Sequence, residues 1–395
     1  MKIIYYNYHI NVYDGSYTHA TGMLKALQTI LGKDNIYVFP QPKEVVSHNL
    51  TLEFIKMKSK KVMQLIRVIR KYLLSYYNQQ IILSSIHRSH FRPDAIIARA
   101  EMFDYSPAII ARKLGIKLIL EMNTPMYYEA GILRGLPFFR LIENWERSML
   151  YSADIIYVVS KEIRDLLVKH YHISKEKFVI IPNGYMAHLY QENAMERENI
   201  RKYVRYNFGL MDKFIVVFVG SLKAWHGIEN LLKLASIMSS YDDIVFWVVG
   251  DGEKRDVVIE YLKANKTKNL YWFGKVDFYK MRDLLYTSDL GIMPYAKIDY
   301  FYFSPLKMYD MIGAGLPFIG TNIGQIADLC HRYLSDDFLV ENNEPETLFN
   351  AIFSIYINSQ KRKEMQERVL AIRKYFTWES RAKELLTFIN NWRQK

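Results

Sequence analysis

The stretch Tyr302-Phe-Ser-Pro-Leu-Lys-Met-Tyr-Asp-Met-Ile-Gly-Ala-Gly-Leu-Pro-Phe-Ile-Gly-Thr321 decides the fold of this chain. Pro305 suits the first turn of a helix, and Gly315 suits the position just after its end, where the backbone turns left-handed. Pro317 prevents the helix from resuming, and residues 318–319 are typical of a short buried strand. The pattern therefore predicts a loop, a helix and a strand in close succession.

A helix that begins here has free backbone N–H groups near Ser304, Lys307 in its first turn and Asp310 one turn later. Because a helix N-terminus carries partial positive charge, it favours an anionic group such as a phosphate. A nearby carboxylate can accept hydrogen bonds from sugar hydroxyls. Taken alone, the stretch also fits an ordinary helix between two strands, so its interpretation depends on the rest of the chain.

Length and composition predict a two-domain protein without a membrane span. A chain of 395 residues is too long for one typical core. The single cysteine, Cys330, fits a reducing compartment, so we expect a cytoplasmic protein. The N-terminus is typical of a strand rather than a signal peptide, and no apolar run approaches the ~20 residues of a membrane span. The formal net charge of +12 favours anionic partners, which include nucleotide phosphates, an acidic membrane and nucleic acid.

The N-terminal half alternates strands and helices, which indicates a parallel sheet covered on both faces. We expect strands at residues 2–6, 36–39, 94–98, 117–121, 154–159 and 178–181, and helices at residues 18–30, 141–150 and 161–169. A turn-rich loop at residues 14–19 joins the first strand to the first helix, as in a doubly wound domain whose ligands gather at strand ends. Residues 186–212 are polar and charged, and they are predicted to form a linker.

A basic amphipathic segment occupies residues 55–74. One helical face carries Val62, Leu65, Ile66, Ile69 and Leu73, and its flanks carry Lys60, Lys61, Arg67, Arg70 and Lys71. Such a helix can lie on an anionic membrane. It can equally be a domain helix with a solvated basic side, and both interpretations stay open here.

The pattern of strands and helices restarts in the C-terminal half. Strands are expected at residues 214–219, 244–249, 269–273 and 290–293, and helices at residues 228–237, 278–286, 343–356 and 378–392. Loop 220–227 contains Gly220, which lets a ligand approach the backbone, and Lys223 and His226, which supply donors or positive charge. The loop suits a phosphate, although it also fits a simple strand-to-helix turn.

Several short motifs follow one another in a fixed order. They are residues 118–125 (Leu-Ile-Leu-Glu-Met-Asn-Thr-Pro), 153–160, 181–184 (Ile-Pro-Asn-Gly), 219–227 (Val-Gly-Ser-Leu-Lys-Ala-Trp-His-Gly), 249–252 (Val-Gly-Asp-Gly), 273–274 (Phe-Gly), 304–310 (Ser-Pro-Leu-Lys-Met-Tyr-Asp) and 313–317 (Gly-Ala-Gly-Leu-Pro). Together they resemble the retaining glycosyltransferases of the GT-B fold, in the large family 4. The resemblance covers nearly the whole chain and is strongest from about residue 214 to 330.

The resemblance implies an α/β protein of GT-B architecture, in which two Rossmann-like domains with parallel sheets face each other across a cleft. It places an acceptor-binding domain at residues 1–195, together with a returning C-terminal helix at about 378–395. A nucleotide-sugar-binding domain is expected at residues 205–375. The implied reaction moves a hexosyl group, with retention, from a nucleotide-diphosphate sugar to a saccharide or glycolipid acceptor. Polysaccharide or glycoconjugate biosynthesis is the implied setting.

The motif positions also imply the site residues. Asn123, His226 and Lys307 are expected to act at the reacting sugar and the leaving phosphate. Contacts with the donor and the acceptor are expected at Gly15, Ser16, Gly220, Ser221, Lys223, Lys275, Val276, Tyr302, Phe303, Ser304, Leu306 and Asp310.

Four positions depart from the family pattern. Family members carry two glutamates eight positions apart, which fall here on Tyr302 and Asp310. Asp310 accepts the same bonds as the glutamate that contacts the ribose, whereas Tyr302 is neutral and bulky, so the sugar stays open. The family's phosphate-binding Arg and Lys fall on Ser221 and His226. We therefore expect Lys223 and Lys307 to replace their charge.

Retention without an obvious nucleophile suggests front-face attack, in which the leaving diphosphate takes the acceptor's proton. That scheme needs no metal, and the sequence holds no Asp-x-Asp pair, so no cofactor is expected. Two alternatives stay open: a GT-B nucleotide-sugar epimerase and a non-catalytic nucleotide-sugar-binding protein. A nucleic-acid partner is not expected, because the positive charge accompanies no nucleic-acid-binding module. Contact of residues 55–74 with the inner face of an anionic membrane also stays open.

Overall fold

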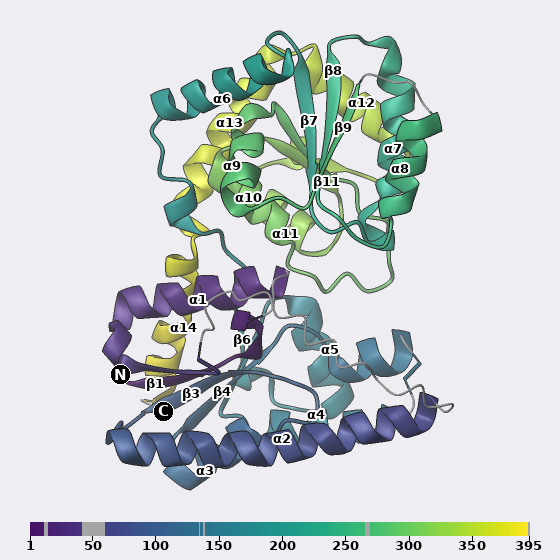
Figure 1. Ribbon diagram of the computed structural model, residues 1–395. Coiled ribbons are helices and arrows are strands. Elements are labelled where there is room, and N and C mark those ends of the chain that lie inside the picture. Colours follow the sequence, from purple (N-terminus) through teal and green to yellow (C-terminus); the bar gives the residue numbers. More distant parts are fainter. Residues whose placement is uncertain (12–14, 42–59, 134, 137–138, 265–268, 394–395) are drawn as a thin grey trace. The chain divides into compact units, whose positions relative to one another are not determined.

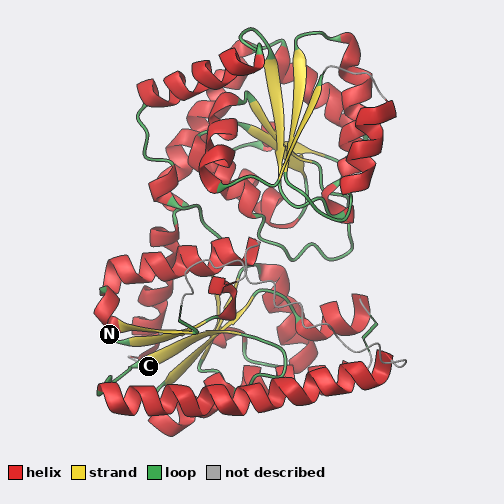
Figure 2. Ribbon diagram, in the orientation of Figure 1, coloured by secondary structure: helices red, strands yellow, loops and turns green. Residues whose placement is uncertain are grey.

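The computed structural model describes residues 1–11, 15–41, 60–133, 135–136, 139–264 and 269–393. The chain divides into two compact units. Unit 1 comprises residues 1–182 and 381–395, and unit 2 comprises residues 183–380. Each unit holds a parallel sheet with helices on both of its faces (Figure 1, Figure 2). The predicted fold of two parallel α/β domains is thus confirmed.

Unit 1 is built on a sheet with the strand order β2-β1-β3-β4-β5-β6 among the described residues. Its strands are β1 (Ile3–Tyr6), β2 (Ile36–Phe39), β3 (Ala95–Arg99), β4 (Lys117–Met122), β5 (Ile155–Val158) and β6 (Phe178–Ile180). Its helices are α1 (Gly15–Leu31), α2 (Lys60–Ser89), α3 (Ser106–Leu114), α4 (Phe139–Ser152) and α5 (Lys161–Tyr171). Because β1 lies between β2 and β3, the strand order reverses there, and ligands of such sheets bind at the carboxyl ends beside the reversal.

Unit 2 repeats this plan with the strand order β12-β11-β10-β7-β8-β9. Its strands are β7 (Phe214–Val219), β8 (Ile244–Val249), β9 (Leu270–Gly274), β10 (Leu290–Met293), β11 (Phe318–Thr321) and β12 (Leu339–Val340). Its helices are α6 (Ala194–Phe208), α7 (Ile228–Ile237), α8 (Arg255–Ala264), α9 (Phe278–Thr287), α10 (Leu306–Ala314), α11 (Gly324–Tyr333), α12 (Pro345–Tyr356) and α13 (Ser359–Ile372), and α14 (Trp378–Arg393) begins here and continues into unit 1. The order reverses between β7 and β10, so the loops after these strands flank the expected ligand position.

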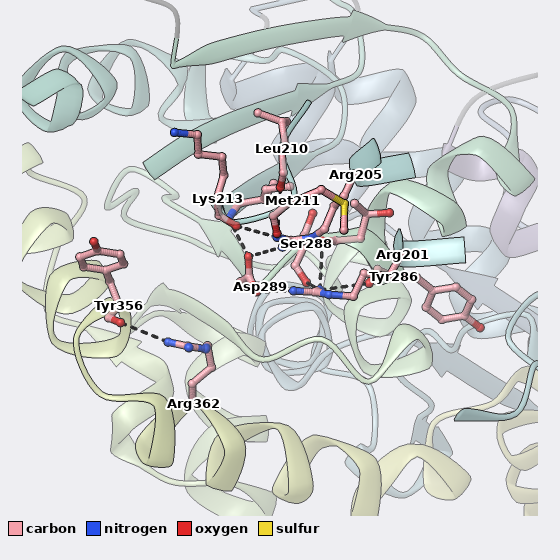
Figure 3. Close-up of polar contacts among 12 residues, drawn as sticks. Arg201, Arg205, Leu210, Met211, Lys213, Tyr286, Ser288, Asp289, Tyr356 and Arg362 are labelled. Atoms are coloured by element: carbon pink, nitrogen blue, oxygen red, sulfur yellow. Dashed lines mark hydrogen bonds and ion pairs between the residues drawn. The ribbon is translucent and has the colours of Figure 1, made fainter. Parts of the chain in front are cut away.

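The interpretation of residues 186–212 as a linker is wrong, because helix α6 lies within them and packs on unit 2. Figure 3 shows Arg201 and Arg205 of α6 converging on Asp289, which precedes β10. Each guanidinium lies 2.6 Å from one carboxylate oxygen of Asp289. The same carboxylate accepts a hydrogen bond of 2.8 Å from the backbone N–H of Ile215 at the start of β7. Asp289 therefore ties α6 to two strands of the sheet.

The basic amphipathic segment is only partly described. Residues 55–59 lie outside the described residues, and α2 begins at residue 60. Two members of the predicted apolar face, Ile69 and Leu73, are 50% and 67% exposed. They do not contribute to the core of unit 1. No helix among the described residues is long and apolar enough to cross a membrane.

Candidate functional site

The helix that decides the fold begins close to its predicted position. Pro305 is the N-cap of α10 rather than its first helical residue, and Gly315 ends the helix with a left-handed φ of 68°. The loop before α10 is fixed by Asn183, which follows β6. Its backbone N–H donates to Ser304 Oγ at 3.0 Å, and its side-chain amide donates to the Ser304 carbonyl at 2.7 Å. The Ile-Pro-Asn-Gly motif thus positions the start of α10.

The ammonium group of Lys307 is buried at the start of α10. Its Nζ lies 4.1 Å from the centre of the Phe218 ring and 5.0 Å from that of Tyr295, and it has no hydrogen-bond partner among the described residues. A Cβ atom at Gly220 would lie 2.8 Å from this Nζ, and the φ of 140° at this position also favours glycine. Burial lowers the pKa of Lys307 to about 7. A buried cation without a partner is unfavourable, and an anion that reached it would gain a strong contact.

The loops after β7 and β8 approach each other closely. Gly220 and Gly250 adopt φ values of 140° and 136°, which favour glycine. A Cβ atom at Gly250 would lie 1.9 Å from the Gly220 carbonyl oxygen, and one at Gly252 would lie 2.7 Å from the backbone nitrogen of Leu222. The glycines of the Val-Gly-Asp-Gly motif therefore allow the β8 loop to support the predicted phosphate loop.

His226 and Ser221 lie in that loop and contact each other. The His226 Nδ1 forms a short hydrogen bond with the Ser221 carbonyl, so the proton resides on Nδ1. Burial, followed by the positive charge of Lys307, lowers the pKa of His226 to about 3. The imidazole is therefore neutral near pH 7, which favours its predicted role as a hydrogen-bonding group over its role as a cation.

The other two predicted cations, Lys223 and Lys275, are not buried without a partner as Lys307 is. Lys223 Nζ lies 3.8 Å from Glu253, whose carboxylate also accepts a hydrogen bond of 2.7 Å from the Ala224 backbone. Its charge is thus partly satisfied within the protein. Lys275 is exposed after β9, and Val276 beside it is partly buried. Lys307 is consequently the predicted cation with the strongest need for an anionic partner.

Asp310 lies one turn after the start of α10 and contacts a residue that the sequence analysis missed. The hydroxyl group of Tyr190 donates to the Asp310 carboxylate at 3.1 Å. Burial raises the pKa of Asp310 to about 7. Tyr190 comes from residues 186–212, which the sequence analysis interpreted as a linker. The one sign in the sequence that Tyr190 could have a role was an aromatic side chain among polar residues. Leu306, between Pro305 and Lys307, is partly buried.

The segment before α10 packs against loop 220–227 through aromatic rings. Phe303 stacks on Trp225 with 5.9 Å between ring centres and 4° between ring planes. Tyr302 is buried and packs on Phe303 at 4.4 Å, and Phe301 contacts Tyr295 edge to face at 5.0 Å. These contacts bring the two predicted donor segments of unit 2 side by side.

The predicted site residues of unit 1 lie at strand ends and at the start of α1. Gly15 and Ser16 belong to the first turn of α1, so the expectation that they lie in a loop is wrong. Ser16 Oγ lies 2.5 Å from His9 Nδ1. Residues 12–14, which precede them, lie outside the described residues.

Asn123 takes part in a buried polar cluster whose centre, Glu121, the sequence analysis noted only as the end of a strand. Its amide donates a short hydrogen bond to Glu121, and the His19 imidazole lies 2.9 Å from the same carboxylate. Burial by itself raises the pKa of Glu121, but the neighbouring His19 and Arg99 lower it to about 2. The sequence offered one sign of this cluster: Glu121 is a charged residue near the end of a largely apolar strand.

A pocket of about 240 Å³ adjoins this cluster within unit 1. Arg99 and Asn123 line it together with Glu129, whose carboxylate accepts a hydrogen bond of 2.6 Å from Thr124. The pocket thus offers a cation, an amide and a carboxylate, which are groups suited to binding hydroxyls. Among the described residues, no group of three or more His, Cys, Asp or Glu could hold a metal ion. Metal independence stays a prediction.

Comparisons with known proteins give the relatives of this chain by sequence and by fold. A relative in Bacillus subtilis (strain 168), the putative teichuronic acid biosynthesis glycosyltransferase TuaH, is 25% identical over 207 residues, which are 52% of this chain and 49% of TuaH. The chain spans about half the length of the first curated relatives, 49% and 46%.

Two solved structures share the fold over nearly their whole length. Anabaena Alr3699/HepE in complex with UDP has a TM-score of 0.68 at 16% identity, covering 99% of this chain and 100% of that one. WaaG, a glycosyltransferase involved in lipopolysaccharide biosynthesis, has a TM-score of 0.65 at 17% identity, covering 97% and 98%. Two family models also match without overlap: Glycosyltransferase Family 4 over residues 18–186, and Glycosyl transferases group 1 over residues 213–358. With both halves matched and the GT-B fold present, the chain belongs to the group 1 glycosyltransferases of family 4 type.

Proposed function

We propose that this protein transfers a hexosyl group, with retention, from a nucleotide-diphosphate sugar to a saccharide or glycolipid acceptor in glycoconjugate or polysaccharide biosynthesis. The observation that carries the proposal is the buried, unpartnered ammonium of Lys307 below Gly220 at the start of α10. A diphosphate at the end of β7 would give this cation its partner. The UDP in the HepE structure supports a nucleotide as the donor's leaving group.

The remaining groups of unit 2 then take defined roles. Asp310 accepts hydrogen bonds from the ribose hydroxyls, with Tyr190 holding its carboxylate. The Nε2 of the neutral His226 is left as a hydrogen-bond acceptor, because Nδ1 donates to the Ser221 carbonyl. Tyr302 and Phe303 border the sugar, and the backbone around Lys275 and Val276 meets the base.

The acceptor is assigned to unit 1, where the pocket beside Asn123 offers hydrogen-bonding groups. In the proposed front-face reaction, the acceptor hydroxyl forms a bond to the anomeric carbon while the bond from that carbon to the diphosphate oxygen breaks. The proton of the hydroxyl passes to the leaving diphosphate. The protein contributes orientation and stabilises the negative charge on the departing oxygen, and no metal is required.

Titration with UDP-glucose, GDP-mannose and ADP-glucose by calorimetry tests the donor class directly. We expect one of the three to bind, and a radiolabelled sugar to move from it onto an extract of saccharide and lipid-linked acceptors. Product formed without an acceptor would favour an epimerase. Donor binding with neither transfer nor hydrolysis would favour a non-catalytic binding protein, and absence of binding would contradict the proposal.

Donor affinity is expected to peak near pH 7. Above about pH 7, Lys307 loses its proton in the free protein, so the affinity falls by up to about tenfold per pH unit. Below about pH 7, Asp310 gains a proton and no longer accepts hydrogen bonds as an anion, so the affinity falls on that side as well. Calorimetric titration with UDP-glucose across this range measures both limbs.

Two substitutions separate the limbs of this profile. Lys307→Met should remove the alkaline limb, and Asp310→Asn should remove the acidic one, each at a lower maximum affinity. A profile that is flat in the unmodified protein, or that keeps both limbs in both variants, would contradict the assignment.

A further inference from the structure

Helix α2 of unit 1 turns a row of large apolar side chains outward. Its buried residues in this region are Ser75, Asn78, Gln79, Ile82 and Ile86. Ser75 Oγ accepts a hydrogen bond of 3.0 Å from the backbone N–H of Tyr105 at the start of α3. This buried polar side chain therefore has a partner within unit 1. The large side chains that stay exposed define the outer face of α2: Ile69, Tyr72, Leu73, Leu74, Tyr76, Tyr77 and Ile81. The usual amphipathic helix of a globular domain keeps most of its large apolar side chains in the core, whereas α2 leaves these seven exposed.

The position of α2 keeps this face open within its unit. Figure 1 shows α2 as a long helix along the rim of unit 1, next to α3. The most exposed side chains, Leu73, Tyr76 and Tyr77, are 67%, 65% and 62% exposed. Scattered single apolar residues need no explanation, but a continuous apolar face marks a contact surface.

The charged residues in this part of the sequence are all basic. The sequence contains no Asp or Glu from residue 54 to residue 93. Helix α2 itself contains Lys60, Lys61, Arg67, Arg70, Lys71 and Arg88. Lys71 forms an ion pair of 2.6 Å with Glu101, which lies outside α2 in unit 1. Arg70 is exposed.

An anionic lipid surface fits both properties. A second copy of the chain, placed symmetrically on the same face, would bring two runs of cations together without a compensating acid on α2. Lipid phosphates instead complement the cations, while tyrosine side chains suit the boundary between headgroups and acyl chains. We propose that α2 docks on an anionic bilayer, with Leu73, Tyr76 and Tyr77 inserted below the headgroups.

Cosedimentation with vesicles tests this docking. The full-length protein should bind vesicles of phosphatidylcholine mixed with phosphatidylglycerol, bind phosphatidylcholine alone more weakly, and lose affinity as salt is added. The triple variant L73Q/Y76Q/Y77Q should bind the mixed vesicles about tenfold more weakly or worse, because it loses the inserted apolar area. The matched control M195Q/Y203Q/Y206Q removes three side chains on α6 that are 70%, 70% and 76% exposed, and it should bind as the unmodified protein does.

Two results would overturn the docking proposal. One is an unmodified protein that does not sediment with the mixed vesicles, and the other is a triple variant that sediments equally well. A dimer that dissociates in the triple variant, without vesicle binding, would assign the outer face of α2 to a second copy instead. The proposal does not rest on the donor site, so UDP-glucose titration of the triple variant separates its failure from that of the proposed function.

Discussion

Replacing Lys307 by methionine is expected to weaken donor binding and, at the same time, to stabilise the free protein. Methionine fills a similar volume between Phe218 and Tyr295 but carries no charge. Loss of a charge-assisted contact with the diphosphate should cost about 1.5–3 kcal/mol, or roughly 10- to 150-fold in affinity for UDP-glucose. Removal of a buried cation without a partner should raise the free energy of unfolding by about 1–3 kcal/mol.

The sign of the stability effect follows from the pKa of Lys307. Its pKa in the folded protein is about 7, below the ordinary value of 10.5 for lysine, so the unfolded chain binds more protons between these values. Stability from this group therefore rises with pH in that window and is lowest below it, where the buried amine must carry its charge. The stabilisation by methionine should accordingly be larger at about pH 6 than at about pH 10.

Denaturant unfolding and calorimetry measure the two effects separately. Lys263→Met, which alters an exposed lysine of α8, is the matched control and should change both quantities by less than about 0.5 kcal/mol. A Lys307→Met variant that is less stable and binds UDP-glucose as before would show that the ammonium has a purely structural role.

Replacing Asp289 by alanine is expected to destabilise unit 2 by about 3–5 kcal/mol. The substitution leaves the guanidinium groups of Arg201 and Arg205 without their carboxylate, and it removes the acceptor of the Ile215 N–H. The side chains of Arg205 and Asp289 are only 7% and 13% exposed, so the change leaves uncompensated buried charge.

Glu198→Ala provides the control for this experiment. Glu198 forms an exposed pair with Lys202 on the same helix, with side chains 52% and 64% exposed, and such pairs contribute little. Urea unfolding followed by the fluorescence of Trp247, which is buried in unit 2, should separate the two variants by several kcal/mol. Equal and small losses would mean that α6 is not held through Asp289.

The regular elements of unit 2 follow from local sequence. Strands β7, β8 and β10 have the predicted bounds, because each is a nearly unbroken apolar run that a sheet covered on both faces requires. Asp277 caps α9 and accepts a hydrogen bond of 2.8 Å from the Lys280 N–H. These features depend only on residues that are close together in the sequence, so they can be predicted from the sequence alone.

The properties that depend on distant residues were not predictable. That Lys307 is buried follows from Gly220 and Tyr295 lying beside it, and these come from separate loops. The neutral state of His226 depends on the same burial and on Lys307. The role of Asp289 depends on Arg201 and Arg205, which lie 88 and 84 positions before it in the sequence. The exposure of the outer face of α2 was not predictable either, because its apolar spacing resembles that of a core helix.

Proton uptake during donor binding tests the central claim most directly. UDP-glucose is titrated by calorimetry at about pH 8 in buffers of different ionisation enthalpy, which gives the number of protons bound per donor. If the diphosphate pairs with Lys307, its amine is mostly neutral before binding and charged afterwards, so the uptake should be about one proton, and Lys307→Met should abolish it. Binding of UDP-glucose without proton uptake, or with the same uptake in Lys307→Met, would contradict the claim.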